Sequence, residues 1–497
     1  MNAADIPAVI EKSRKAQELW AELPYKERAR RLKKAAKLLA ARRDEITETI
    51  HRENGKLSID ALSAEVLPAI MAFSYYTKQG RRFLDSRKIR GGNLLMFFKR
   101  SRLVFGPWGV VGIISPWNYP FAIPFSEVVM ALLAGNGVIL KAASNTPEAG
   151  RGVAAVFAAA DLPDGLFAHV ELPGKEAGPA FIDAGVDKLF FTGSTAVGRE
   201  LMALAAPRLL PLVLELGGAD AALVRKDADL DRAVSGIVWA AYSNGGQSCG
   251  GVQRVLVHRD VYEPFLEKIC AAVKKLRPGS GPDCDLGPLI SIRQKQEVRK
   301  QVEACLAGGA RIAAQSPGSM EDESPFAPAL VLTGVTPQMP VMAAEIFGPV
   351  LAVVPAADDQ EALKIANSSP YGLTASVWSG NHKQARALAA RINAGAVMIN
   401  DHLMSHGLAE TPWGGFGDSG LGRTHGEAGF REMLKTKVII DDILPGAKRN
   451  LWWQPYSEKL YKGIQAIASL AGGPGLGDRL GAIPAVIRVF LRSWGKG

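Results

Sequence analysis

Apolar residues recur at every third or fourth position between residues 5 and 85, and charged residues fill the positions between them. This period predicts amphipathic helices with solvated outer faces. Beyond residue 108 the pattern changes to short apolar runs of the β type that alternate with helical stretches. Such alternation predicts a doubly wound parallel sheet covered by helices. The runs predicted to be strands are residues 110–115, 137–141, 189–192 and 212–216.

A second alternation of the same kind begins at Ala219. It predicts a second doubly wound sheet, and a chain of 497 residues has room for about two to four domains. No internal repeat is evident. The predicted strands of this part are residues 222–225, 255–258, 351–355, 375–378 and 397–400.

Between the helical start and the first sheet, residues 87–107 have the pattern of a β-hairpin. They contain Gly91, Gly92 and Asn93 as a turn signal, and two short basic and apolar runs at residues 94–98 and 101–105. A further β-type run at residues 436–440 is suited to pair with this hairpin.

The net charge of +10 is concentrated near the end of the chain. Residues 443–497 hold eight lysines and arginines against two acids, a net charge of +6. The sequence has neither zinc-finger spacing nor interleaved basic and aromatic residues, so no nucleic-acid partner is expected.

Four irregularly spaced cysteines indicate a reducing compartment. No apolar leader and no run of about 18 apolar residues occurs, so a cytoplasmic protein is expected.

Cys249 is the cysteine with the most informative surroundings. It ends the loop Asn244-Gly245-Gly246-Gln247-Ser248-Cys249, between a helical pattern and a β-branched run. Loops of small residues in such places expose nucleophiles. A buried structural cysteine remains the alternative for this loop taken alone.

Three other segments supply matching chemistry. Asn118 lies in Pro116-Trp117-Asn118-Tyr119-Pro120, where two prolines rigidify a loop around one amide. Glu215 is a lone carboxylate near the end of an apolar strand, and residues 193–198 form a glycine turn that opens a helix. A thiol, an amide donor, a carboxylate and such a turn are the parts of covalent catalysis on a carbonyl beside a dinucleotide.

Together with the segment Glu345-Ile346-Phe347-Gly348-Pro349-Val350, these motifs resemble the aldehyde dehydrogenase superfamily from about residue 16 to about residue 441. The resemblance implies an α/β fold with two doubly wound parallel-sheet domains, a Rossmann-like cofactor domain and a catalytic domain, plus a small bridging β-hairpin. It also implies a homodimer or a dimer-based tetramer. The expected parts are a dinucleotide-binding domain (1–86 and 108–217), a bridging β element (87–107 and 432–442), a catalytic domain (218–431) and a basic amphipathic extension (443–497).

The resemblance assigns the reaction as oxidation of an aldehyde to a carboxylic acid. Cys249 would form the thiohemiacetal and then the thioester, and the Asn118 amide would stabilise the oxyanion with the Cys249 N–H. Glu215 would activate water for hydrolysis. Relatives that pass the acyl group to coenzyme A lack this glutamate, so its presence favours water as acceptor. The alternatives are that Asn118 caps a turn and that Glu215 is a structural strand-end acid.

NAD or NADP is the implied cofactor. The turn from Gly193 to Gly198, with the Ser194 hydroxyl, would face a phosphate. Lys141 would reach the adenine-side ribose, and where many members carry an acid three residues later this chain has Ser144. Because serine does not repel a 2′-phosphate, NADP is plausible. The other residues assigned to the cofactor side are Glu345, which would bind the nicotinamide ribose, with Phe347, Trp117 and Leu216.

Two further motifs are set aside. Residues 415–420 read G-x-G-x-x-G, but they follow no strand and open no βαβ unit, so a structural loop near the substrate entrance is expected. His402 and His406 lack the H-E-x-x-H pattern, so no metal site is predicted.

The substrate side is less constrained. Tyr119 and Trp413, with Trp117, match positions that form an aromatic wall in the family, although aromatic residues are also ordinary core residues. A small semialdehyde, of the succinate-semialdehyde kind and oxidised with NADP, is the alternative to a long-chain or lipophilic aldehyde. A non-catalytic binding protein on the same fold is the less favoured reading.

The extension after residue 442 supports a lipophilic substrate if it contacts a membrane. A glycine-rich spacer at residues 472–481 precedes a predicted helix at residues 484–496. Arg488, Arg492 and Lys496 fall on one helical stripe, with apolar residues mostly elsewhere. This pattern is typical of a helix that lies on an anionic membrane surface. Docking of the apolar face on the protein's own dimer is the alternative.

Overall fold

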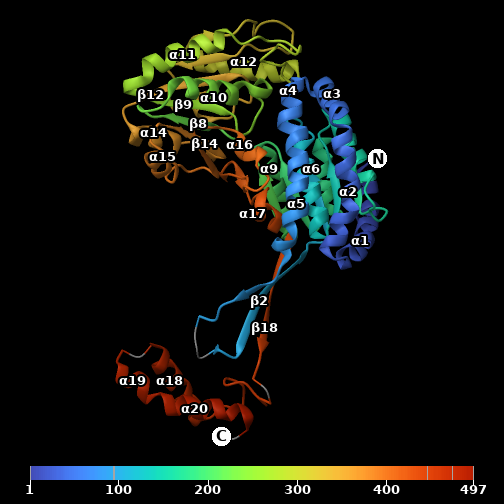
Figure 1. The fold of residues 1–497 in the computed structure, drawn as a ribbon, viewed down its shortest axis with the longest axis vertical. Coiled ribbons are helices and arrows are strands. Elements are labelled where there is room, and N and C mark those ends of the chain that lie inside the picture. Colours follow the sequence, from blue (N-terminus) through green and yellow to red (C-terminus); the bar gives the residue numbers. More distant parts are fainter. Residues whose placement is uncertain (1, 93–95, 445, 473, 496–497) are drawn as a thin grey trace. The chain divides into compact units, whose positions relative to one another are not determined.

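The computed structural model describes residues 2–92, 96–444, 446–472 and 474–495 (Figure 1). The chain divides into two compact units. The large unit comprises Met1–Leu84 and Gly106–Lys435, and the small unit comprises Asp85–Phe105 and Thr436–Gly497.

The first sheet of the large unit has the order β17-β7-β6-β3-β4-β5. Its strands are parallel except for β17, a two-residue antiparallel strand on β7. The four predicted strands are present, and β5 and β17 are strands that the sequence pattern did not predict. The bounds are β3 Val110–Ile114, β4 Gly137–Lys141, β5 Phe167–His169, β6 Lys188–Thr192, β7 Leu212–Glu215 and β17 Gly420–Leu421.

Helices cover this sheet, as the alternation of strand and helix runs predicted, and the N-terminal segment is helical, as its period predicted. Helix α6 is buried along its whole length, as expected for a helix that is apolar on every side. It ends at Gly135, whose φ of 100° suits glycine. The bounds are α1 Ile6–Glu22, α2 Tyr25–Ala41, α3 Arg43–Asn54, α4 Ser58–Ala61, a π-helical turn Leu62–Val66, α5 Leu67–Leu84, α6 Ala122–Ala134, α7 Pro147–Ala158, α8 Gly174–Asp183 and α9 Thr195–Ala205.

The second sheet of the large unit has the order β10-β11-β12-β9-β8-β14-β15 and is parallel except for β10. The five predicted strands are present, and β10 and β11 are additional. A two-stranded pair, β13 with β16, lies apart from it. The strands are β8 Asp220–Val224, β9 Val252–His258, β10 Arg311–Gln315, β11 Leu330–Thr333, β12 Val350–Ala356, β13 Tyr371–Gly372, β14 Thr374–Trp378, β15 Ala396–Ile399 and β16 Phe416–Gly417.

Helices pack on both faces of the second sheet, and the side chains between them form its core. The two doubly wound sheets confirm the predicted α/β fold. The helices are α10 Leu230–Tyr242, α11 Tyr262–Lys274, α12 Ile292–Ala307, α13 Pro340–Ala343, α14 Asp359–Ala366, α15 His382–Ala389, α16 Met404–Gly407 and α17 Gly426–Glu432.

The small unit contains a three-stranded sheet of order β1-β2-β18, with β1 Arg87–Ile89, β2 Lys99–Pro107 and β18 Leu434–Asp442. The hairpin and its pairing with the later run are present, but the prediction of a strand at residues 94–98 is wrong. Residues 96–98 form a turn, and Asn93 and residues 94–95 lie outside the described residues. The first strand, β1, precedes the glycines, and Phe98 belongs to the core of the small unit.

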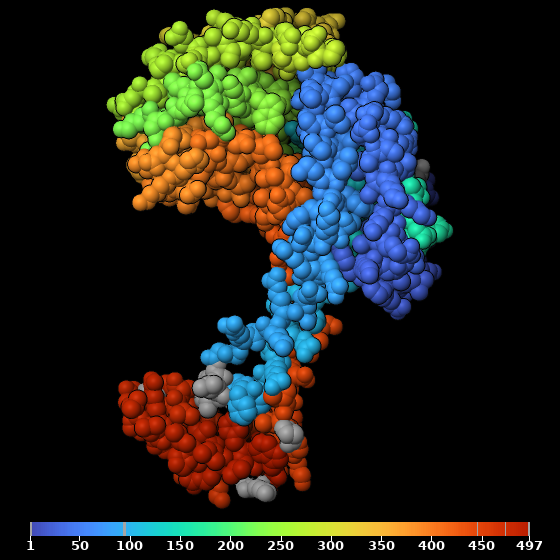
Figure 2. Space-filling view, viewed as in Figure 1, coloured from blue at the N-terminus to red at the C-terminus, as the bar shows by residue number. Residues whose placement is uncertain are grey.

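Three helices complete the small unit: α18 Glu458–Gly472, α19 Leu476–Gly481 and α20 Ile483–Leu491 (Figure 2, red). The prediction of a spacer at residues 472–481 is therefore wrong over α19. Val489 packs on Gly463 of α18, where a Cβ would lie 1.7 Å from its Cγ2. In the described part of the chain, no helix is both long and apolar enough to cross a membrane.

The predicted basic stripe of the tail is partly wrong. The α-helix ends at Leu491, and the Arg492 guanidinium donates to the backbone oxygens of Leu451, Trp453 and Pro455. Arg492 therefore ties the tail to its own unit, whereas Arg488 is exposed. Lys496 lies outside the described residues.

Candidate active site

The loop that carries Cys249 lies between α10 and β9 and has an unusual backbone. Asn244, Gly245 and Gly246 have φ values of 53°, 64° and 72°. A Cβ on Gly246 would lie 2.3 Å from the Gly348 backbone oxygen, so glycine is required there. The loop thus turns sharply and brings Cys249 between the two sheets.

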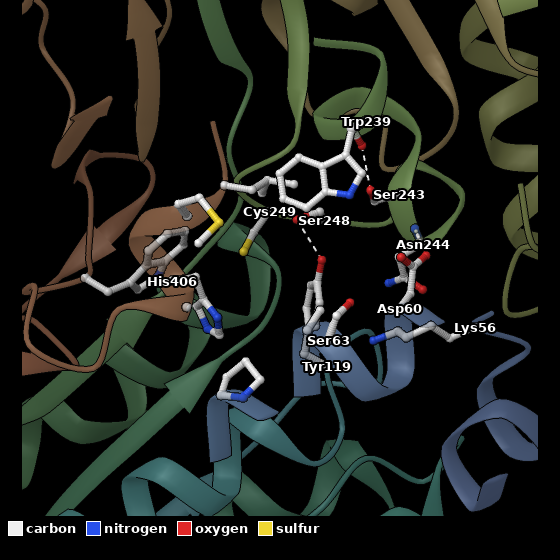
Figure 3. Close-up of a pocket in the computed structure, with 16 residues that line it drawn as sticks. Lys56, Asp60, Ser63, Tyr119, Trp239, Ser243, Asn244, Ser248, Cys249 and His406 are labelled. Carbon is white, nitrogen blue, oxygen red and sulfur yellow. Dashed lines mark hydrogen bonds between the residues drawn. The ribbon is translucent and has the colours of Figure 1, made fainter. Parts of the chain in front are cut away.

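Two cavities meet at Cys249. The first has a volume of about 280 Å³ and receives residues from the ends of β3, β6 and β7. The second has a volume of about 270 Å³ and is shown in Figure 3. The first is lined by Pro116, Trp117, Asn118, Thr192, Gly193, Ser194, Leu216, Gly217, Cys249, Gln294, Glu345 and Phe347.

Most of the surface that lines the second cavity is apolar. Tyr119 donates its hydroxyl proton to Ser248 Oγ over 3.3 Å, a bond that is visible beside Cys249 in Figure 3. Its lining includes Tyr119 and Trp413 of the predicted aromatic wall, whereas Trp117, the third residue of that wall, lines the first cavity. The lining residues are Lys56, Asp60, Ser63, Ala64, Pro68, Tyr119, Trp239, Ser243, Asn244, Ser248, Cys249, Leu403, Met404, His406, Gly407 and Trp413.

The Cys249 thiol is held in its protonated form. Burial raises its pKa well above the usual value, and the carboxylates of Glu345, Asp220 and Glu215 raise it further. A backbone hydrogen bond offsets only part of this rise. The thiol must therefore lose its proton before it can act as a nucleophile.

Asn118 lies directly beside the Cys249 loop. Its Nδ2 donates to the Gln247 backbone oxygen over 3.1 Å, and Asn244 Nδ2 donates over 3.1 Å to the Asn118 backbone oxygen. Asn118 and Cys249 both line the first cavity. The structure therefore brings the amide and the thiol to one surface.

Glu215 is the last residue of β7 and is buried. Burial raises the pKa of its carboxyl well above the usual value, and Glu127 raises it further. Arg423 and the Trp413 indole offset part of the rise. Glu215 lines neither of the two cavities, although its neighbour Leu216 lines the first.

Glu345 and Phe347 form one wall of the first cavity. Glu345 Oε1 accepts a hydrogen bond of 3.1 Å from the Gly218 amide, and burial raises the pKa of Glu345 to about 7. The Phe347 ring meets the Trp117 ring edge to face, with centroids 5.4 Å apart. These contacts bring together three of the residues assigned to the cofactor side.

The glycine turn has a more structural role than the sequence indicated. The Gly193 amide donates over 3.0 Å to the Glu215 backbone oxygen, so that amide is already used. Ser194 is the N-cap of α9 and accepts from the Val197 amide. Gly198 does not line the cavity; a Cβ there would lie 2.6 Å from Leu216 Cδ2. Gly198 therefore allows α9 to pack on β7.

Lys141 and Ser144 lie together but outside the lining of the first cavity. Lys141 ends β4, and burial lowers the pKa of its ammonium. Its Nζ is 3.4 Å from Ser144 Oγ, and Ser144 is exposed. A ligand bound beside Lys141 would therefore face the uncharged hydroxyl of Ser144.

The G-x-G-x-x-G segment forms short strands, which agrees with its rejection as a dinucleotide motif. Gly420 pairs with Glu215 across β17 and β7, and Ser419 Oγ donates over 2.7 Å to the Gly217 backbone oxygen. The segment therefore fixes the end of β7.

The two histidines singled out in the sequence have different surroundings. His402 Nε2 is 3.0 Å from the Gly250 backbone oxygen, and His406 lines the second cavity.

Sequence reasoning missed several polar residues that support the site. Asp220 accepts from the amide and hydroxyl of Thr374 at 3.1 and 2.5 Å, and burial raises its pKa to about 8. Lys56 and Glu65 form a buried ion pair of 2.6 Å. Asp220 could have been singled out from the sequence, because it is an acid at the start of the apolar strand β8. Nothing in the helical period of the N-terminal segment marked Lys56 or Glu65.

Two doubly wound sheets and a half-buried cysteine that lines two cavities define the class of protein. A family model described as "Aldehyde dehydrogenase family" matches residues 1–439. The chain therefore belongs to the aldehyde dehydrogenase family and is an oxidoreductase, as its motifs predicted.

Individual relatives agree with this assignment. The chain is 37% identical over 473 residues to a 4,4'-diapolycopene aldehyde oxidase of Methylomonas sp, covering 94% of this chain and 88% of the relative. It is 36% identical over 440 residues to a Mycobacterium tuberculosis protein provisionally named succinate-semialdehyde dehydrogenase (NADP+) 2, covering 88% and 84%. The crystal structure of an NAD-dependent aldehyde dehydrogenase from Sinorhizobium meliloti matches with a TM-score of 0.85 and 33% identity, covering 91% and 89%.

Proposed function

We propose that this protein oxidises lipophilic aldehydes to carboxylic acids with NAD(P)+ and water. The observation that carries the proposal is the second cavity, which is mostly apolar and ends at the Cys249 thiol. The first cavity also reaches this thiol, and we assign it to the nicotinamide.

The first chemical step is addition of Cys249 to the aldehyde. The thiol gives its proton to solvent water, its sulfur forms a bond to the carbonyl carbon, and the C=O electron pair moves to oxygen. The developing oxyanion needs fixed donors, and loss of one such donor typically lowers the rate about 10²–10³-fold. The position of Asn118 beside the Cys249 loop supports its amide as one donor, with the Cys249 N–H as the other.

The first cavity fits the nicotinamide end of the cofactor. Gly217 leaves it open beside Glu345, because a Cβ there would lie 2.5 Å from Glu345 Oε2. Glu345 would hold the ribose hydroxyls, Phe347 and Trp117 would hold the ring, and the N-terminus of α9 at Ser194 would face a phosphate. When bound, the nicotinamide supplies the acceptor for the hydride that leaves the carbon on Cys249.

Both NAD and NADP are proposed cofactors. Ser144 is exposed beside Lys141 and carries no charge that would repel a 2′-phosphate. The mycobacterial relative is named for NADP+, and the Sinorhizobium meliloti structure is of an NAD-dependent enzyme.

Hydrolysis of the Cys249 thioester completes the reaction. Water adds to the acyl carbon and gives up a proton, the C–S bond breaks, and the Cys249 thiol is restored. Glu215 is proposed as the general base, because the burial that raises the pKa of its carboxyl makes its carboxylate a stronger proton acceptor. Because Glu215 does not line the cavities, its carboxylate must turn toward Cys249 for this step. The overall change is aldehyde, NAD(P)+ and water to acid, NAD(P)H and a proton.

The charges around the second cavity favour a lipophilic aldehyde over succinate semialdehyde. Among the described residues that line it, Lys56 is the sole lysine or arginine, and it is paired with Glu65. Burial lowers the pKa of His406 to about 4, so this ring is neutral at pH 7. Asp60 adds a second acid. A substrate carboxylate would therefore lack an unpaired cation, whereas an apolar chain suits this lining, as the name of the Methylomonas relative suggests.

A homo-oligomer is proposed on the geometry of β18. This strand is an edge of its sheet, and its residues from Lys435 to Asp442 are exposed on both faces. Val438, Ile439 and Ile440 are among them. A long exposed apolar edge pairs readily with another chain, and β18 of a second copy is the proposed partner.

A reducing compartment is proposed as well, because the Cys249 thiol must stay free to act as the nucleophile.

The helices of the small unit are proposed to rest on an anionic membrane. Leu476 and Leu480 give α19, and Ile487 and Leu491 give α20, an exposed apolar stripe at i, i+4 spacing, and Trp453 is also exposed. Nearby charges are mainly positive, which favours acidic lipids and disfavours an equally charged second copy on this face. Contact with a membrane would also place the enzyme where lipophilic aldehydes dissolve.

A series of aldehydes tests the proposed function. Straight-chain aldehydes from butanal to dodecanal and succinate semialdehyde would be compared with NAD and with NADP, by absorbance of the reduced cofactor. We expect kcat/KM to rise with chain length, since each buried CH₂ contributes about 0.8 kcal/mol. The Cys249→Ala variant should bind cofactor and show no turnover. Higher kcat/KM with succinate semialdehyde than with the long chains would contradict the substrate assignment.

A further inference from the structure

The buried ion pair of Lys56 and Glu65 encloses the loop of Asn118. Both side chains are fully buried, and their charged atoms are 2.6 Å apart. Lys56 follows α3, and Glu65 lies in the π-helical turn before α5. A buried pair of charges in this position is costly unless every hydrogen bond is made.

Lys56 reaches the carbonyl side of Asn118. Its Nζ donates to the Asn118 backbone oxygen over 2.7 Å, and Asn244 Nδ2 donates to the same oxygen. The ammonium also lies 4.0 Å from the centroid of the Tyr119 ring, and Figure 3 shows it extending toward that side chain. The peptide after Asn118 is thus held by a charged donor.

Glu65 holds the chain on the other side of Asn118. Its Oε2 accepts from the amides of Phe121 and Ala122 at 2.7 and 3.1 Å, at the start of α6. Helix α6 is buried throughout, so its N-terminus is a rigid anchor. The carboxylate therefore links Lys56 to α6, the helix that begins four residues after Asn118.

We propose that Lys56 and Glu65 are positioning residues that aim the Asn118 amide at the oxyanion. This inference rests on the proposed role of Asn118. The pair fixes both ends of the segment 118–122 against a rigid helix, while the Asn118 side chain faces the Cys249 loop. A displacement of about 1 Å at such a donor can lower the rate about 100-fold. Neither residue contacts the reacting atoms.

A double-mutant cycle tests the proposal. Lys56→Met, Asn118→Ala and the double variant would be compared by the pre-steady-state rate of reduced-cofactor formation. We expect Lys56→Met to slow this rate at least tenfold in the parent and less than twofold in the Asn118→Ala background, because the two residues act through one donor. Cofactor KM should stay within twofold.

Two further variants keep the test decisive. Lys188→Met is the matched control, because Lys188 is also buried and paired, with Glu432 at 2.5 Å, away from the Cys249 loop. It should lower Tm without slowing the burst.

If Lys56→Met does not fold, Glu65→Gln provides the same cycle, since glutamine keeps the shape of the glutamate side chain. Full additivity with Asn118→Ala would overturn the inference, whereas a normal burst in Asn118→Ala would overturn the role of Asn118 itself.

Discussion

The Cα of Gly218 faces the peptide carbonyl of Cys249 so closely that a Cβ would lie 2.2 Å from its oxygen. The amide of the same glycine donates to Glu345 Oε1. Because Gly218 has no side chain, the Cys249 loop can approach the chain just after β7. The Gly218 amide also orients the Glu345 carboxylate, which lines the first cavity.

Gly218→Ala should lower kcat/KM about 100-fold, because the Cys249 loop or the glycine backbone must move to admit the methyl group. Steady-state kinetics would measure the loss. Gly152→Ala in α7 is the control, since the nearest atom to its Cβ would be a Phe121 ring carbon at 3.8 Å. That variant should keep full activity and gain up to about 1 kcal/mol of stability. Equal activities of the two variants would show that the close approach at Gly218 has no catalytic consequence.

Glu215→Gln should retain a first burst of reduced cofactor and then stall as the acyl-enzyme. The amide keeps the shape of the side chain but cannot accept the proton of water, so deacylation should slow about 10²–10⁴-fold. Stopped-flow absorbance measures the burst, and mass spectrometry detects the acyl group on Cys249. A lost burst would assign Glu215 to an earlier step.

The affinity for cofactor should depend on pH through Glu345. Its pKa is raised to about 7, so the carboxyl is mostly protonated below this pH and mostly ionised above it. The ionised form is the better acceptor for ribose hydroxyls, so KM for cofactor should fall as the pH rises through 7. Glu345→Gln should raise KM and remove this pH dependence. A parent profile that is flat between about pH 6 and 8 would contradict the role of Glu345.

Ser144→Glu should raise KM for NADP far more than KM for NAD. The new carboxylate would face the 2′-phosphate, and like charges in a partly buried site cost about 1–3 kcal/mol, or about 5- to 150-fold. Asn145→Glu is a matched control, because the next residue is exposed as well. Equal changes for both cofactors in Ser144→Glu would show that residue 144 does not face the ribose.

Membrane contact should depend on the exposed stripe of α19 and α20. Leu480, Ile487 and Leu491 would be changed together to glutamine, which spares the packed residue Val489. We expect the parent, and not this variant, to sediment with phosphatidylglycerol vesicles, and added salt to weaken the binding. Leu209→Gln is the control, a change at an exposed leucine of the large unit. An intact protein that ignores these vesicles, with a triple variant of smaller assembled mass, would indicate a protein interface instead.

The sequence was sufficient where a residue's role depends on its own segment. The strands of both sheets follow from local apolar runs, and the position of Cys249 follows from a loop of small residues beside a β-branched run. Asn118 could be singled out because the prolines that rigidify its loop are adjacent in the chain. Such features are local, so periodicity and turn chemistry reveal them.

The rest depended on contacts between distant segments. Lys56 meets Asn118, and Glu65 meets Phe121, across more than fifty residues, and no pattern in a helical segment marks such a pair. Residues 476–481 are rich in glycine, yet they form a helix in the packed small unit. Gly198 looked like part of a phosphate turn, whereas its lack of a side chain is needed for Leu216.

The placement of one thiol between two cavities has a consequence for inhibition. An inert apolar molecule that fills the cavity of Tyr119 and Trp413 leaves the cavity of Glu345 accessible, because these residues line different spaces. Such a compound should compete with the aldehyde and not with NAD(P)+. A cofactor analogue should show the reverse pattern, and both compounds should bind to one enzyme molecule at the same time.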